Sequence, residues 1–174
     1  MSTLIDSNGV YCGPSTYIGD LDLSGCTSLT SLGLLKEVGG SLYLRDCISL
    51  TSLGALEKVV RWLDLRGCTS LTSLGLLKEV AGSLDLRDCI SLTSLGALEK
   101  VVGSLDLRGC ISLTSLGALE KVTGSVILSY GNIISFEDFK KELGAAELLP
   151  LEDLPRYLTE MSITSIVARR KLAL

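Results

Sequence analysis

Apolar and polar residues follow one 21-residue pattern through most of this chain. In the first unit the apolar positions are Leu21, Leu23, Cys26, Leu29, Leu32, Leu35 and Val38, with polar or small residues between them. Leu21 and Leu23 lie two apart, so an extended strand places both on one face and Asp22 on the other. The later apolar positions turn inward around a coil. Because one coil cannot bury these groups alone, the pattern predicts a stack of coils.

The unit recurs with little change along the chain. Its copies begin at Leu21, Leu42, Leu63, Leu84 and Leu105, and Val126 starts a sixth, degenerate copy. The first and third copies share CTSLTSLGLLKEV, and the second and fourth share RDCISLTSLGALEKV, which indicates an underlying 42-residue block. A unit of 21 residues has room for a turn or a 3₁₀ segment on its outer side but hardly for an α-helix.

The pattern LxLxxCxxLTSLxxLxxV resembles the leucine-rich repeat family. Leu21, Leu23, Cys26 and Leu29 carry the match in the first unit, and their counterparts carry it in the four later units. The pattern is most similar to the short cysteine-containing type, of microbial or viral-like character, in which Cys replaces the usual Asn. The resemblance covers about residues 18–135. It implies an α/β solenoid, a right-handed horseshoe with a parallel β-sheet on its concave face.

Three segments follow from this organisation. They are an N-terminal cap over residues 1–20, leucine-rich repeats over 21–135, and a helical C-terminal cap over 136–174. The period breaks after Ser135, a good helix N-cap, and Phe136, Phe139 and Leu143 then provide an apolar helix face. An alternative for the end of the chain is a partner-binding tail at 168–171.

Composition limits the compartment and the chemistry. The chain has 174 residues, a net charge of -4, no run of apolar residues long enough for a membrane span, and no basic start typical of a signal peptide. The five repeat cysteines share one structural position, so they cannot all pair with one another. We therefore expect a cytoplasmic protein, not bound to a membrane, with a reduced ladder of buried thiols.

Nothing in the sequence indicates an enzyme. The chain lacks histidine, the commonest general base, and it has neither a nucleophile–base pair on one patch nor a phosphate-binding glycine loop. The ladder thiols lie in one line and point into the core, whereas zinc needs ligands that converge from several directions. We expect no catalytic residue, no metal and no cofactor.

Charged residues form columns on both sides of the predicted coil. On the outer side, Lys and Glu alternate from coil to coil in the columns that start at Lys36 and Glu37, except at the final step, and this alternation would keep the coils in register. The exposed face of the parallel sheet carries the column Asp22, Tyr43, Asp64, Asp85, Asp106 and the column Ser24, Arg45, Arg66, Arg87, Arg108. One interpretation is that these Asp and Arg side chains only neutralise each other.

The repeat departs from its own template at one place. Four units have Ser immediately before the first strand Leu, but the third has Trp62, and Arg61 replaces the preceding Gly. In a stacked parallel sheet Trp62 and Tyr43 are diagonal neighbours, close enough for their rings to meet. The predicted partner-binding residues are Tyr43, Arg45, Arg61, Trp62, Asp64, Arg66, Arg87 and Arg108. The alternative is a local packing repair around Trp62.

The function predicted from these observations is non-enzymatic protein–protein recognition through the concave face. The partner is a protein of unknown identity, and a homodimer is an alternative. Nucleic-acid binding along the Arg column is less favoured, because the Asp column cancels the positive field. A further alternative is ice binding through the Ser-x-Thr array that starts at Ser28 and Thr30, whose hydroxyls would share one flat face if the segment is extended. Hydroxyls that satisfy turn backbones explain the array more simply.

Overall fold

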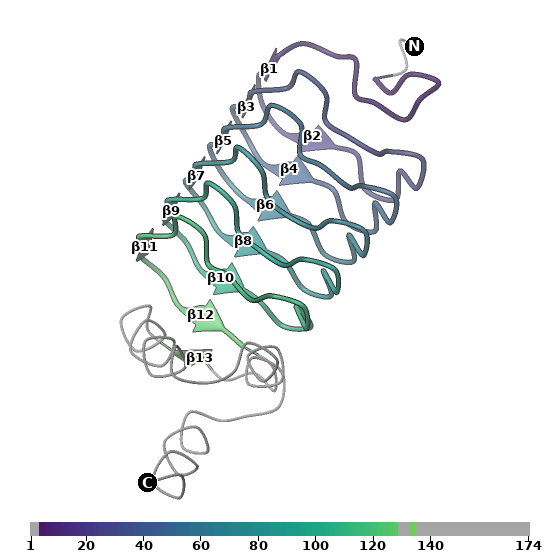
Figure 1. The fold of residues 1–174 in the computed structure, drawn as a ribbon. Coiled ribbons are helices and arrows are strands. Elements are labelled where there is room, and N and C mark those ends of the chain that lie inside the picture. The colour runs from purple at the N-terminus through teal and green to yellow at the C-terminus, as the bar shows by residue number, and fades with distance from the viewer. Residues whose placement is uncertain (1–3, 129–132, 135–174) are drawn as a thin grey trace, which may run out of the picture.

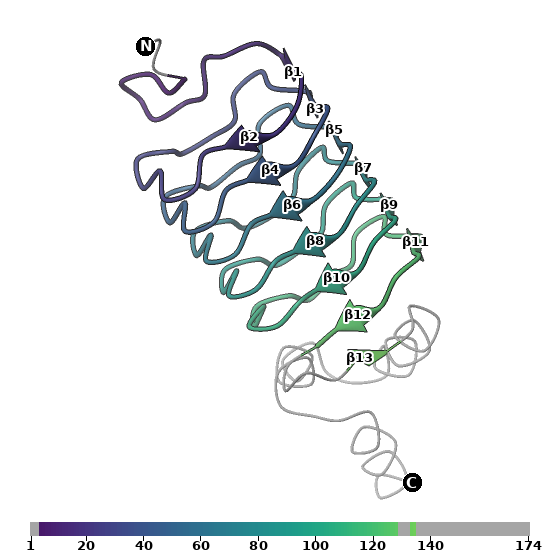
Figure 2. The same ribbon diagram turned by 180° about the vertical axis from the view of Figure 1, so that it is seen from behind.

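The computed structural model of the chain describes residues 4–128 and 133–134. Over this range the chain winds into a stack of coils, and each full coil contributes one short strand to each of two parallel sheets (Figures 1 and 2). We name them the inner sheet, which contains the LxL segments, and the outer sheet, which contains the Glu-Val and Lys-Val segments. The predicted solenoid of stacked coils is confirmed.

The inner sheet follows the repeat register. Its strands are β2 (Leu21–Asp22), β4 (Leu42–Tyr43), β6 (Leu63–Asp64), β8 (Leu84–Asp85), β10 (Leu105–Asp106), β12 (Val126–Ile127) and β13 (Ile133–Ile134). Strands β2 to β12 pair in parallel with a shift of 21 residues, so that Leu42 lies opposite Leu21. β12 carries the degenerate sixth copy, and β13 pairs with it antiparallel.

The outer sheet stands where the sequence predicted a turn or a 3₁₀ segment. Its strands are β1 (Thr16–Tyr17), β3 (Glu37–Val38), β5 (Lys58–Val59), β7 (Glu79–Val80), β9 (Lys100–Val101) and β11 (Lys121–Val122). The Val of β3 to β11 is buried, and the preceding Glu or Lys reaches the surface. Main-chain bonds join each coil to the one before it, as from Val60 N–H to the Val38 carbonyl at 3.0 Å.

The stack is nearly straight rather than horseshoe-shaped (Figures 1 and 2). Strands on both sides of a coil are spaced alike, at about 4.8 Å, so neither side is wider than the other and little curvature results. The described residues contain no helix, and none therefore that could cross a membrane. The described part is thus a β-solenoid rather than an α/β one, and the predicted helical cap at 136–174 lies outside the described residues.

Leucine columns and a thiol ladder fill the interior between the two sheets. Cys47, Cys68, Cys89 and Cys110 are buried, and each Sγ–H donates to a main-chain carbonyl of the preceding coil at 3.0 to 3.2 Å. Burial raises the pKa of all four thiols, to about 11 for Cys47 and about 12 for Cys110. The ladder is therefore protonated at neutral pH and inert. Cys26, at the N-terminal end of the column, is partly buried.

The N-terminal residues cover the first coil. Tyr11 is buried in the core, and its main-chain N–H donates to the Ser31 carbonyl at 3.0 Å. Val10 pairs with Ser31 in a parallel bridge, and β1 begins the outer sheet. The described part of this segment therefore continues the pairing pattern of the coils.

The 42-residue block has a steric basis. The position after the inner-sheet Arg alternates between Gly and Asp, and Asp46 and Asp88 adopt left-handed conformations with φ of 59° and 61°. A Cβ placed on Gly67 would lie 2.4 Å from Oδ1 of Asp46. Gly in the next coil therefore makes room for the Asp side chain of the coil before it, and two such carboxylates never face each other directly.

Candidate partner-binding site

The predicted contact between the unique tryptophan and its diagonal neighbour is confirmed. Tyr43 lies on β4, and Trp62 directly precedes β6. Their ring centroids are 5.9 Å apart and their planes meet at 77°, an edge-to-face arrangement. The guanidinium carbon of Arg66 lies 5.9 Å from the centroid of the Trp62 ring, within reach of a cation–π interaction. Tyr43 and Arg66 therefore support Trp62 from two sides.

The Asp and Arg columns of the inner sheet form a continuous ion-pair ladder. Nε of Arg66 donates to Oδ1 and Oδ2 of Asp64 at 2.9 and 3.1 Å, and it lies 3.5 Å from Oδ2 of Asp85 in the next coil. Arg87 repeats this arrangement toward Asp85 and Asp106, and Arg108 pairs with Asp106.

Burial makes this ladder structural. Asp64, Asp85 and Asp106 are all buried, with Asp64 only 2% exposed. Hydrogen bonds to the Asp carboxylates raise the pKa of Arg66, Arg87 and Arg108 above the ordinary value for arginine. For these residues the interpretation of mutual neutralisation fits the geometry. Arg87 and Arg108 face outward with their charge already compensated, and Asp64 sits beneath Arg66.

The remaining two predicted arginines differ from this pattern. Arg45 follows Tyr43 by two residues in the sequence, but its Nε pairs with the exposed carboxylate of Asp46 at 3.2 Å. Arg61 is exposed, and among the described residues no ion pair involves it. Tyr43, Trp62 and Arg66 thus lie close together, and Arg61 is the residue that precedes Trp62. Arg45 pairs with Asp46 instead of joining this group.

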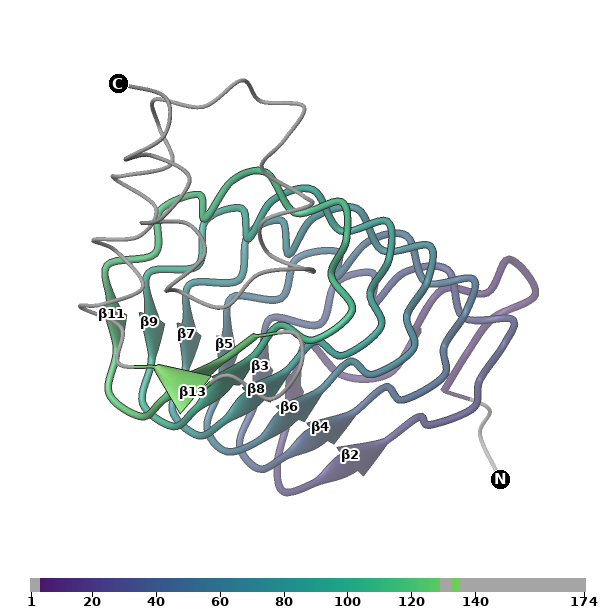
Figure 3. The ribbon, with the colours of Figure 1, turned by 90° about the horizontal axis from the view of Figure 1, so that it is seen from below.

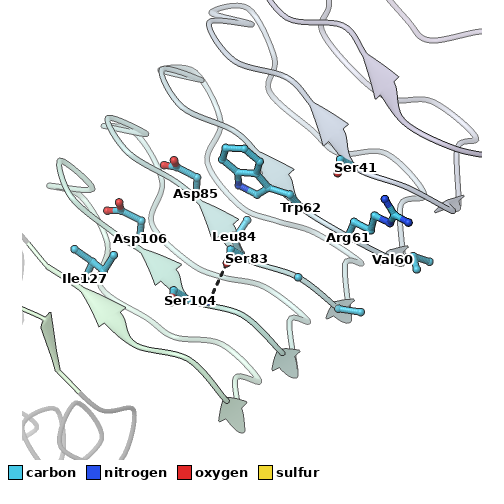
Figure 4. Close-up of a pocket in the computed structure, with 12 residues that line it drawn as sticks. Ser41, Val60, Arg61, Trp62, Ser83, Leu84, Asp85, Ser104, Asp106 and Ile127 are labelled. Atoms are coloured by element: carbon cyan, nitrogen blue, oxygen red, sulfur yellow. Dashed lines mark hydrogen bonds between the residues drawn. The ribbon is translucent and has the colours of Figure 1, made fainter.

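Trp62 forms one wall of a groove of about 550 Å³ beside the inner sheet (Figure 4). Its lining includes Val60, Arg61, Ala81 and Gly82. These residues lie in the short turns that lead from the outer sheet into the inner sheet, and Figure 3 shows the path of the backbone at this corner. Its lining residues are Ser41, Val60, Arg61, Trp62, Ala81, Gly82, Ser83, Leu84, Asp85, Ser104, Asp106 and Ile127. Figure 4 shows the Trp62 ring on the side of Asp85, whereas the Arg61 side chain extends away from the Asp row.

Sequence reasoning found the wall of this groove but missed its floor. Ser83 and Ser104 occupy the positions equivalent to Trp62 in the next two coils, and the Ser104 N–H donates to Oγ of Ser83 at 3.1 Å. Both residues match the repeat template, so the sequence pattern does not distinguish them as site residues. The signal was the contrast itself, because a large ring followed by small residues in the same column leaves space beside the ring.

The Ser-x-Thr array is tied to the backbone. The hydroxyls of Thr51 and Thr93 donate to the carbonyls of Thr30 and Thr72 in the preceding coils, at 3.2 and 3.0 Å. Ser49 lies in a turn instead of an extended segment. The hydroxyls of this array do not share one extended strand. In residues 4–128 and 133–134, no group of three or more Cys, Asp or Glu side chains is arranged to hold a metal ion.

Comparison with known proteins adds no family to this description. No protein-family model, no curated protein and no solved structure matches the chain. The resemblance to the leucine-rich repeat family stays a prediction based on the repeat residues. What the site does must be inferred from its own chemistry.

Proposed function

We propose that this chain is a leucine-rich-repeat-type protein without catalytic activity that binds a protein partner on the face of the inner sheet. One observation carries the proposal. The repeat departs from its template at Trp62, and there Tyr43 and Arg66 hold the ring against a groove. Trp, Tyr and Arg are the residues that most often dominate the binding energy of protein interfaces.

The charges of the face support a protein partner over a nucleic acid. A phosphate backbone is bound by unpaired Lys and Arg side chains that release counterions. Here Arg66, Arg87 and Arg108 are each paired with at least one buried Asp. The absence of disulfides among the ladder cysteines Cys47, Cys68, Cys89 and Cys110 also suits a reducing compartment such as the cytoplasm.

Affinity capture from a cell lysate tests this proposal. The informative variant is Tyr43→Asp with Trp62→Ser, because each change restores the residue that four of the other repeats carry at that position. The control is Leu34→Ala with Leu76→Ala, which removes exposed apolar side chains outside the groove lining. We expect one partner to be retained by the wild type and the control and lost by the template-restoring variant.

Thermal unfolding must first show that the wild type, the template-restoring variant and the control have similar melting temperatures, so that a loss of capture does not reflect unfolding. Equal capture by all three would contradict the proposal and move binding to another surface. A wild-type protein that retains only further copies of itself would favour the homodimer alternative instead.

A further inference from the structure

The groove beside Trp62 has the dimensions of a short extended peptide. Its lining reaches from Ser41, before β4, to Ile127 on β12, and these two strands are four steps apart in the inner sheet. Neighbouring strands lie about 4.8 Å apart, so the groove is about 19 Å long. An extended chain rises about 3.3 Å per residue, so about six residues fit along it. The groove runs across the strands, along the axis of the stack (Figure 4).

The charges around the groove are compensated except at one point. Asp85 accepts hydrogen bonds from Arg87 and lies 3.5 Å from Nε of Arg66. Asp106 is bonded by Arg108 and lies 3.6 Å from Nε of Arg87. Among the described residues that line the groove, Arg61 is the one charged group without an ion pair. The site therefore offers one uncompensated positive charge at its rim, on a side chain that extends away from the Asp row (Figure 4).

The lining distinguishes a peptide from a sugar. Val60, Ala81 and Ile127 present apolar surface, and Gly82, Ser83 and Ser104 leave space at the floor. A hydroxyl-rich ring would need free acceptors, but the two carboxylates are already occupied by guanidinium groups and Oγ of Ser83 already accepts a main-chain N–H. An apolar side chain, by contrast, gains from burial against Trp62 without breaking these bonds.

We propose that this groove binds an extended acidic peptide segment of the partner. An apolar side chain of the segment packs on the floor against Trp62, and a neighbouring carboxylate pairs with Arg61 at the rim. The inference rests on the proposed function, because it names the part of the partner that the inner-sheet face recognises.

Selection from a random heptapeptide library displayed on phage tests the inference with the full chain. Peptides enriched on the wild type are synthesised, and their dissociation constants are measured from the fluorescence of Trp62, the only tryptophan in the chain. We expect the enriched peptides to place Asp or Glu beside a Leu, Ile or Phe. Replacing that acid with Gln should weaken binding at least about tenfold, because a charge-assisted hydrogen bond is lost.

Two variants separate the charge from the wall. Arg61→Gly restores the template residue, and it should remove the preference for acid while keeping the preference for an apolar side chain. Trp62→Ser, followed with fluorescein-labelled peptide, should abolish binding. Lys36→Ala removes one positive charge that does not line the groove, and it should leave the selected peptides bound as before.

Several outcomes would overturn the inference. These are enrichment of neutral or basic peptides, an acid preference that survives in Arg61→Gly, or no enrichment at all. If the wild type dimerises and Trp62→Ser abolishes the dimer, the groove binds a second copy of the chain instead. If lysate capture still depends on Tyr43 and Trp62 while no peptide is enriched, the acidic-peptide inference fails and the proposed function stands. If lysate capture does not depend on Tyr43 and Trp62 and no peptide is enriched, both the acidic-peptide inference and the proposed function fail.

Discussion

The inner and outer sheets both stack charged side chains coil upon coil, yet they handle those charges differently. On the inner sheet the side chains of Arg66 and Asp64 are 28% and 3% exposed. On the outer sheet those of Lys78 and Glu57 are 55% and 46% exposed, and their charged atoms are 3.5 Å apart. Inner pairs join planar guanidinium forks to buried carboxylates, whereas outer pairs join flexible ammonium groups to solvated ones. The difference predicts unequal contributions to stability.

The comparison teaches that a regular column of charge on a solenoid face is not by itself a binding surface. Inner-sheet Asp and Arg residues two apart share a face, so each Arg folds back over its own Asp and reaches the next one. Such a ladder holds coils together and leaves little charge for a ligand. Departures from the repeat template, as at Trp62 and Arg61, are the better guide to recognition.

Breaking the inner ladder should have the largest effect. Arg87→Ala leaves the buried carboxylates of Asp85 and Asp106 without one of their partners. Removing one member of a fully buried pair costs about 3–5 kcal/mol, and partial exposure of Arg87 reduces this to about 2–3 kcal/mol. Urea unfolding at neutral pH measures the change. A loss no greater than that of Lys100→Ala, which removes an outer pair, would make the two sheets equivalent.

Much of the fold could be predicted from the repeat because its period sets the register. A shift of 21 residues at Leu21 places identical residues side by side, and the LxL spacing identifies the inner strands. The outer sheet could not be predicted in the same way. A two-residue segment such as Glu37–Val38 contains one polar and one apolar position, too few to show an alternation. Its pairing depends on main-chain bonds between coils, which no side-chain pattern records.

The thiol ladder between the sheets should give the next largest effect. Cys68 is fully buried, and its Sγ–H donates to the Leu44 carbonyl at 3.2 Å. Cys68→Ser places a more polar and smaller group among apolar neighbours, so we expect a loss of about 1–3 kcal/mol in the free energy of unfolding. Thermal unfolding monitored by circular dichroism provides the test. An unchanged melting temperature would mean that the column faces solvent.

Restoring the template at the groove should cost less stability than either change. Trp62→Ser removes the edge-to-face contact with Tyr43 and the contact with Arg66, together about 1 kcal/mol. The same variant should lose the captured partner. A loss above about 3 kcal/mol, comparable to a large-to-small core substitution, would instead identify Trp62 as a packing element of the coil. Urea unfolding, with Leu76→Ala as the exposed apolar control, separates the two interpretations.

The candidate site was predictable only in part, for reasons specific to its residues. The meeting of Tyr43 and Trp62 follows from the register, because diagonal neighbours on one face are close. The burial of Asp64 does not follow, since its position alternates with buried Leu and belongs to the outward face. It is covered by the guanidinium of Arg66, which lies over the sheet. The groove was also missed, because Ser83 and Ser104 look ordinary until the space above them is seen.

Charge reversal on the outer sheet should have a small effect. Lys78→Glu replaces the pair with Glu57 by a like-charge contact, but both positions are well solvated. We expect a loss below about 1 kcal/mol, which added salt should reduce further. Urea unfolding at low and high ionic strength checks both points. A loss as large as that of Arg87→Ala would show that the outer column is a main structural element.

The smallest expected effect concerns the pH dependence of the outer sheet. Lys100 and Lys58 flank Glu79 at 3.0 and 3.6 Å, and the hydrogen bond from Lys100 is the main cause that lowers the pKa of this carboxyl. A carboxyl with a lower pKa in the folded state contributes stability above its unfolded pKa and loses that contribution as the pH falls through the folded value. Glu79→Gln should therefore cost about 0.3 kcal/mol at pH 7 and nothing at about pH 2, where both states are protonated.

Urea unfolding of the wild type and Glu79→Gln at both pH values measures this difference. Arg87→Ala serves as the reference, because its loss at neutral pH should be several times larger. If Glu79→Gln instead cost as much as Arg87→Ala at pH 7, exposure would not distinguish the two sheets. Regular charge on either face would then have to be treated as structural.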